Sequence, residues 1–335
     1  MFPTFFIALA AILSVFCIVA LGVFLRRYGR LTHESEQPLL RLTIDVLLPC
    51  LIIDRVLRTD AFSEPQNLWL PALLGFGLVA VGIVFGLCVA LLPAKLNGLE
   101  NWKQRRTFAG CVGILNYGFV PIPLVAVMFP GDDRTLGVLF VQNLGVELTV
   151  WTILLFTLTG TIDRKSFRRV INAPNIAIVT AVSLNLLGNS RFIPDTFHEH
   201  VAPCFDFLLL AIHLLGAAAI PLSIIIIGTI FADHFHWSEI KERLPSTLKI
   251  AFWSVLIRLV IMPVIFISLA VWLPCTIEIK RVLVIHGAMG SAILPMALAK
   301  HYGGDPKTAF DTILSNSLLS ALTLPLWIAI GLSLV

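Results

Sequence analysis

The chain has 335 residues, of which 58% are hydrophobic and only 13% are charged, and its formal net charge is +4. Soluble domains carry about 25% charged residues, so too few polar side chains are present to cover a water-exposed surface. The composition argues against a soluble protein and predicts an all-α protein that crosses a membrane many times. The small positive charge is expected to reflect orientation in a lipid bilayer and predicts no nucleic-acid partner.

Apolar stretches follow one another along the whole chain. A transmembrane helix needs about 20 apolar residues, and this rule predicts ten spans with no long soluble domain between them. The spans are expected at residues 4–25, 37–57, 68–92, 106–129, 135–160, 174–190, 205–231, 247–273, 281–300 and 308–333.

The distribution of basic residues predicts the orientation of these spans. No charged residue precedes the first span, and Arg26, Arg27 and Arg30 follow it. The loops after the first, third, fifth, seventh and ninth spans carry most of the Lys and Arg residues of the loops. Because cytoplasmic loops are enriched in these residues, we expect a multi-pass protein of the inner or plasma membrane with both termini outside.

The fourth span contains the segment NYGFVPIPL (116–124), which disfavours a regular helix. Pro121 and Pro123 lack a backbone N–H and restrict the residue before them, whereas Gly118 permits an irregular turn. We expect a break near 117–123, with a new half-helix that starts at Pro123. Such a break at membrane depth is either a packed kink or the wall of a binding cavity, and the N-terminus of a half-helix favours an anion.

An internal repeat relates this segment to a second one with a constant offset of 172 residues (290 − 118). The offset aligns residues that shape the backbone, namely Gly118 with Gly290, Pro123 with Pro295, Gly131 with Gly303 and Pro49 with Pro221. It predicts two five-span repeats, 1–163 and 164–335, and a second break near 289–295. An odd number of spans inverts the second repeat, and inverted repeats with broken helices are typical of secondary transporters.

Four segments, in this order, resemble the auxin efflux carrier family: NYGFVPIPLVAVMFPG, VQNLGVELTVWTILLF, GAAAIPLSIIIIG and ILPMALAKHYGGDPKTAF. That family includes plant auxin carriers and bacterial carriers that resemble malonate and malate transporters. The resemblance implies that broken spans 4 and 9 cross, that spans 1, 2, 6 and 7 form a scaffold, and that spans 3–5 and 8–10 move as an elevator in a homodimer. It also implies that Asn116 contacts a substrate carboxylate. The second crossover departs from the plant carriers, since it offers Ser291 in place of an Asn.

These patterns predict a substrate site around the two breaks. Its expected residues are Asn116, Tyr117, Gly118, Pro121, Pro123, Gln142, Asn143, Gly290, Ser291, Pro295 and Asn316. Three residues within the spans are candidates for binding a coupling proton or sodium ion, namely Glu147, His213 and His286. The alternative for Glu147 is a structural role as the partner of Arg258 or of a neighbouring amide, and the two histidines are equally compatible with packing.

The predicted function is therefore secondary transport of a small organic anion, with a proton or sodium as the candidate coupling ion. A channel or a ligand sensor on the same scaffold is the alternative. The chain has no HExxH zinc motif, P-loop or CxxC spacing, so we expect no enzyme activity, no cofactor and no metal site.

Overall fold

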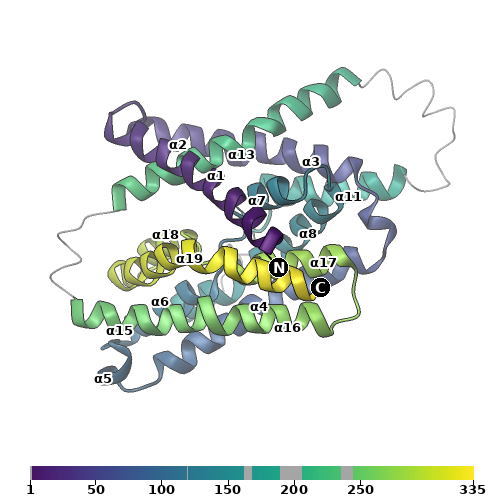
Figure 1. Cartoon of the computed structure of the whole chain (residues 1–335). Helices are drawn as coiled ribbons and strands as arrows, with labels where there is room; N and C mark the ends of the chain where they lie inside the picture. The colour runs from purple at the N-terminus through teal and green to yellow at the C-terminus, as the bar shows by residue number, and fades with distance from the viewer. Residues whose placement is uncertain (1, 119, 162–167, 189–205, 235–243) are drawn as a thin grey trace.

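The structure of the chain is a computed structural model that describes residues 2–118, 120–161, 168–188, 206–234 and 244–335 (Figure 1). Every named secondary-structure element in these ranges is a helix, and β-type pairing among them is limited to one isolated bridge. The predicted all-α fold class is confirmed.

The helices of the first half overlap the predicted apolar spans, except for the short α5, which lies between the third and fourth. They are α1 (Phe2–Arg27), α2 (His33–Leu42), α3 (Leu48–Arg58), α4 (Gln66–Ala90), α5 (Ala94–Asn97), α6 (Trp102–Gly113), α7 (Pro121–Met128), α8 (Asp133–Thr149) and α9 (Leu155–Thr159). The π-helical turn η1 (Thr43–Leu47) joins α2 to α3, and η3 (Val150–Leu154) joins α8 to α9. A short 3-10 turn, η2 (Ala61–Ser63), lies between α3 and α4.

The second half contains seven helices in the described residues. They are α11 (Ala173–Gly188), α13 (Asp206–His234), α15 (Leu244–Val255), α16 (Met262–Trp272), α17 (Ile277–Ala288), α18 (Leu294–His301) and α19 (Pro306–Leu334). The π-helical turn η5 (Leu256–Ile261) joins α15 to α16. The ends of the sixth and seventh predicted spans, at 189–190 and 205, lie outside the described residues.

Five helical stretches in the described part of the chain are long and apolar enough to cross a membrane without interruption. They are Gln66–Ala90, Asp133–Thr159, Phe207–Ile230, Thr247–Trp272 and Pro306–Leu334. Of the other predicted spans, the fourth and ninth are broken and the sixth is short, so the number of ten crossings stays a prediction.

The helices pack in two groups, which Figure 1 shows above and below the middle of the molecule. In the first group, α1 packs along α13, and α3 packs against both α11 and α13. In the second group, α4 packs along α6 and α8, α16 along α17, and α19 against α6, α15 and α17. Contacts of α1 with α7 and α19, and of α3 with α8, connect the two groups. The first group contains the four spans that the family resemblance assigns to the scaffold.

Glycines allow very close approach within both groups. A Cβ atom at Gly22 of α1 would lie 2.9 Å from the Cα of Gly228 in α13. In the second group, a Cβ at Gly145 of α8 would lie 2.7 Å from the backbone nitrogen of Phe76 in α4. Small residues that bring helix backbones together are the usual means of helix association in membranes.

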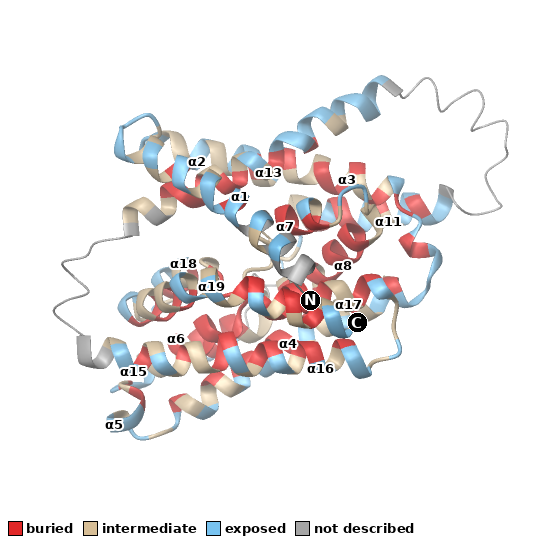
Figure 2. Ribbon diagram, viewed as in Figure 1, coloured by how far each residue is buried: buried red, intermediate tan, exposed pale blue. Residues whose placement is uncertain are grey.

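Buried residues concentrate where α4, α6, α8 and α17 meet (Figure 2). The second half of α6, most of α8 and nearly all of α17 are buried, and α17 is buried although it is too short to cross a membrane alone. The interrupted helices therefore lie in the interior of the protein.

Both predicted breaks are present. α6 ends at Gly113 and α7 begins at Pro121, whereas α17 ends at Ala288 and α18 begins at Leu294. The first break thus lies at 114–120 rather than 117–123, and the prediction that the half-helix starts at Pro123 is wrong. Pro121 takes the first helical position because its fixed φ suits that position. Pro123 follows within the first turn, where N–H groups have no partner inside the helix.

Candidate functional site

The two breaks cross and hydrogen-bond to each other. The backbone N–H of Asn116 donates to the Gly290 carbonyl at 2.9 Å, and the N–H of Ala292 donates to the Ile114 carbonyl at 2.9 Å. Leu115 and Ser291 form the antiparallel bridge between these bonds. Irregular backbone inside a membrane protein requires such partners, so each break satisfies the other. We call the paired segments 114–118 and 289–293 the crossover.

Two half-helices begin at the crossover. α7 and α18 each have eight residues and carry a proline in the first turn, Pro121 with Pro123 in α7 and Pro295 in α18. Both N-termini present the positive end of a helix dipole. In α7, Pro121 and Pro123 have no N–H and the Ile122 N–H donates to the Gly118 carbonyl, so its first turn offers no free N–H. The crossover therefore has two short helices that can favour a negatively charged ligand.

Glu147 of α8 is held by two donors. The Tyr117 hydroxyl donates to one carboxyl oxygen at 2.5 Å, and the Trp151 indole N–H donates to the other at 2.6 Å. Tyr117 belongs to the crossover, so the acid connects the first break to α8 and η3. The alternative role as a partner of Arg258 is wrong, because Arg258 contacts backbone carbonyls instead.

Polar side chains of α8 and α19 surround the second break. The Gln142 amide lies 2.9 Å from Nδ1 of His286 in α17, and both side chains are buried. Asn316 of α19 donates its amide N–H to the Ser291 hydroxyl at 2.7 Å. Gly290 lies against α19, since a Cβ there would be 3.2 Å from the Ser320 Cβ. Side chains from distant parts of the chain therefore meet at the crossover.

Three amide oxygens near this network are buried and accept no hydrogen bond from the described residues. They belong to Gln142, Asn143 and Asn316. Buried polar atoms normally have partners, so these oxygens are candidate acceptors for a bound ligand or ion. Asn116 is half-buried, and its backbone N–H makes its bond across the crossover.

His213 lies away from this network. Its Nδ1 is 3.0 Å from a carboxyl oxygen of Asp54 in α3, so it joins α13 to α3 within the first helix group. Asp54 also accepts from Arg58 at 2.9 Å. The structure thus brings Glu147 and His286 to the crossover and places His213 in a separate ion-pair cluster.

Two further residues, Trp151 and Arg258, contact the site but were not among the predicted site residues. Trp151 lies four residues after Glu147, the spacing at which side chains on one helix face meet. Arg258 is fully buried and donates to the carbonyls of His286 and Met289 at the end of α17. The signal for Arg258 was visible, because a charged residue in the middle of an apolar span is uncommon.

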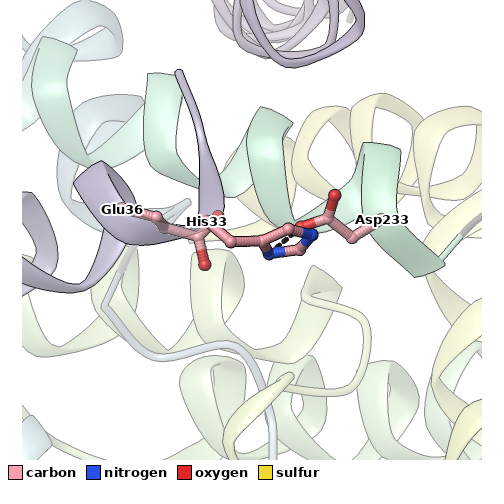
Figure 3. Close-up of side chains that lie close together, drawn as sticks. All are labelled: His33, Glu36 and Asp233. Atoms are coloured by element: carbon pink, nitrogen blue, oxygen red, sulfur yellow. Dashed lines mark ion pairs between the residues drawn. The ribbon is translucent and has the colours of Figure 1, made fainter. Parts of the chain in front are cut away.

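A group of side chains with metal-ligand chemistry lies elsewhere, at the end of α1. Figure 3 shows His33, Glu36 and Asp233, whose ligand atoms lie within 4.8 Å of one another. Arg26 already contacts all three, with its guanidinium 2.8 Å from Glu36, 2.7 Å from His33 Nδ1 and in an ion pair with Asp233. The arrangement is an ion-pair network that ties α1 to α2 and α13.

The family model for "Membrane transport protein" matches the chain over residues 7–164 and again over residues 159–328. The chain belongs to the membrane transport protein family. This confirms the family relationship predicted from the crossover motifs, and it identifies the protein as a membrane transporter.

Two archaeal relatives resemble the chain over almost its whole length. An uncharacterized transporter of Methanothermobacter thermautotrophicus is 25% identical over 317 residues, which cover 94% of this chain and 96% of that protein. An uncharacterized transporter of Methanocaldococcus jannaschii is 24% identical over 337 residues, which cover 96% of this chain and 98% of that protein. Neither description names a substrate.

Proposed function

We propose that the protein is a secondary transporter of small carboxylate anions and binds its substrate at the crossover. The observation that carries the proposal is the pairing of two broken helices in the interior, through the bonds from Asn116 to Gly290 and from Ala292 to Ile114. Broken helices of this kind form the substrate sites of many secondary transporters, where half-helix N-termini point at anionic groups. Membership of a family of membrane transport proteins is consistent with this role.

The crossover offers donors of the kind that a carboxylate needs. The half-buried Asn116 amide and the Leu294 N–H at the start of α18 are neutral donors. Each would bind a carboxylate oxygen more strongly than a neutral one, since charge-assisted hydrogen bonds are about twice as strong. Gln142, Asn143 and Asn316 add acceptor oxygens, which suit a substrate that also carries a hydroxyl group.

Glu147 is the proposed coupling site. Its carboxyl group accepts hydrogen bonds from Tyr117 and Trp151. Binding of a proton or a sodium ion to this acid would therefore change the hydrogen bond to Tyr117, which belongs to the crossover. Exchange of that cation at the two faces of the membrane would couple its gradient to movement of the anion.

The movement that we propose is a displacement of the second helix group against the first. The first group (α1, α3, α11 and α13) would be the fixed scaffold of a homodimer in the inner or plasma membrane, with both termini outside. Two ion pairs connect the groups at one end, Arg55 with Asp133 at 2.9 Å and Arg134 with Asp60 at 3.0 Å. These pairs would have to open when the second group moves.

Counterflow in proteoliposomes tests this function. Purified protein is reconstituted with unlabelled malonate, succinate or malate inside, and uptake of the labelled acid from outside is followed. A carrier predicts saturable uptake that overshoots equilibrium when the interior is preloaded. Flux that neither saturates nor overshoots would indicate a channel, and binding of an acid without flux would indicate a sensor.

A further inference from the structure

Arg258 is a buried cation in the interior of a membrane-spanning helix. It lies in η5, within the apolar stretch Thr247–Trp272, and its relative exposure is 0%. Charged side chains at such depth are costly, and they usually face the protein interior and serve a function. The π-helical turn that carries Arg258 is itself a feature often found at functional sites.

The guanidinium group is attached to the second break. Its Nε donates to the Met289 carbonyl at 2.7 Å, and one terminal nitrogen donates to the His286 carbonyl at 3.0 Å. Both carbonyls belong to the C-terminal end of α17, which carries roughly half a negative charge. These contacts compensate only part of the positive charge. The other terminal nitrogen is buried and donates to none of the described residues.

No carboxylate compensates the remainder within the described part of the chain. All ion pairs there with distances up to 4.0 Å involve other cations, and none includes Arg258. Glu147, the acid at the crossover, accepts hydrogen bonds from Tyr117 and Trp151 and forms no ion pair with Arg258. A buried charge without a counter-ion is strongly unfavourable. We therefore expect a bound anion to supply the negative charge opposite Arg258.

The position of Arg258 indicates where a bound anion would lie. The carbonyl of Met289 is one residue before Gly290, whose carbonyl accepts from Asn116 across the crossover. The guanidinium group therefore contacts the backbone one residue before the position that pairs across the crossover. In a protein interior, electrostatic interactions extend over several ångströms because the effective dielectric constant is far below that of water.

We propose that Arg258 is the specificity-determining residue of the crossover, where the part of its positive charge that no described carboxylate balances selects anionic ligands. It acts through the electric field of its guanidinium group, so it affects the binding of a charged ligand and leaves that of an uncharged one unchanged. This inference rests on the proposed function, since it assigns the charge selectivity of the same site to one residue.

The test compares the binding of an acid and of its uncharged diamide in three proteins. Isothermal titration is carried out with malonate, succinate and malate, and then with the diamide of the acid that binds most tightly. The proteins are wild type, Arg258→Gln, which keeps an amide donor for the carbonyls, and Arg258→Lys, which keeps the charge. Wild type should prefer the diacid to its diamide by at least about tenfold.

Arg258→Gln should bind the diacid about 10- to 30-fold more weakly and leave diamide binding unchanged, whereas Arg258→Lys should keep most of the preference. If folded Arg258→Gln still prefers the diacid to its diamide as strongly as wild type does, the inference is overturned. The role of Arg258 would then be to cap the C-terminal end of α17. If that variant does not fold, wild type alone decides, because equal binding of diacid and diamide would overturn the inference. Absence of binding for all three acids in wild type would instead remove the proposed function, and this inference with it.

Discussion

The contact between α4 and α8 allows a sharp test of how the packing supports the site. Gly75 of α4 faces the backbone of Gln142, and a Cβ there would overlap the Gln142 carbonyl oxygen and lie 3.1 Å from its Cγ. Gly77, two residues further along the same helix, has nothing within 4 Å of the corresponding Cβ position. The substitutions Gly75→Ala and Gly77→Ala therefore add the same methyl group to the same helix in opposite surroundings.

The magnitude follows from two terms. Replacing a helical glycine by alanine stabilises a helix by about 0.8–1 kcal/mol, and this gain is common to both variants. Overpacking of a close contact costs about 1–3 kcal/mol, and this cost applies to Gly75→Ala alone. We expect Gly77→Ala to be neutral or slightly stabilising and Gly75→Ala to be less stable than Gly77→Ala by about 1–3 kcal/mol.

The assay is reversible unfolding in mixed micelles with increasing SDS, followed by the circular dichroism of the helices. Ligand binding by the two variants is measured in parallel, because displacement of Gln142 should also disturb its bond to His286. Equal stability of the two variants, within about 0.5 kcal/mol, would refute the close approach of α4 and α8.

Three further changes test other parts of the account. Tyr117→Phe removes the hydroxyl donor of Glu147 and should lower the unfolding free energy by about 1.5–3 kcal/mol in the same assay, and an unchanged value would mean that the bond does not form. Glu147→Gln cannot titrate, so it should keep binding and counterflow but lose accumulation driven by a pH gradient in proteoliposomes; continued accumulation would make the residue structural. Asp133→Asn breaks the partly exposed pair with Arg55 and should cost no more than about 1 kcal/mol in stability while it changes the transport rate, whereas an unchanged rate would argue against opening of this contact during transport.

The sequence predicted the helical fold and the two breaks because each rests on a local property. Apolar length locates most helices, and proline fixes where a helix can start. The repeat also has a physical basis in the backbone: Gly131 and Gly303, which the offset pairs, both have positive φ values, 79° and 75°. Residues other than glycine rarely adopt such φ values, so glycine at both positions indicates the same kind of turn.

The partners of the polar side chains could not be predicted in the same way. The bonds of Tyr117 to Glu147 and of Asn316 to Ser291 join residues 30 and 25 positions apart, and that of Gln142 to His286 spans 144. Such pairs depend on how helices cross, which periodicity does not specify. For the same reason, the sequence predicts the same coupling role for His213 and His286, whereas the structure places His213 in α13 beside Asp54.

The central claim is that a small carboxylate binds at the crossover, and titration calorimetry of Asn116→Ala tests it most directly. The titrant is whichever of malonate, succinate and malate binds wild type most tightly. The matched control is Asn172→Ala, an identical change at the start of α11, where the Asn172 side chain bonds, among the described residues, only to the neighbouring residues 169 and 175. The account predicts one site per chain in wild type and in the control, and affinity about 5- to 150-fold weaker in Asn116→Ala, the effect of about 1–3 kcal/mol for an unsatisfied buried partner. Wild-type affinity in a folded Asn116→Ala protein would contradict the claim.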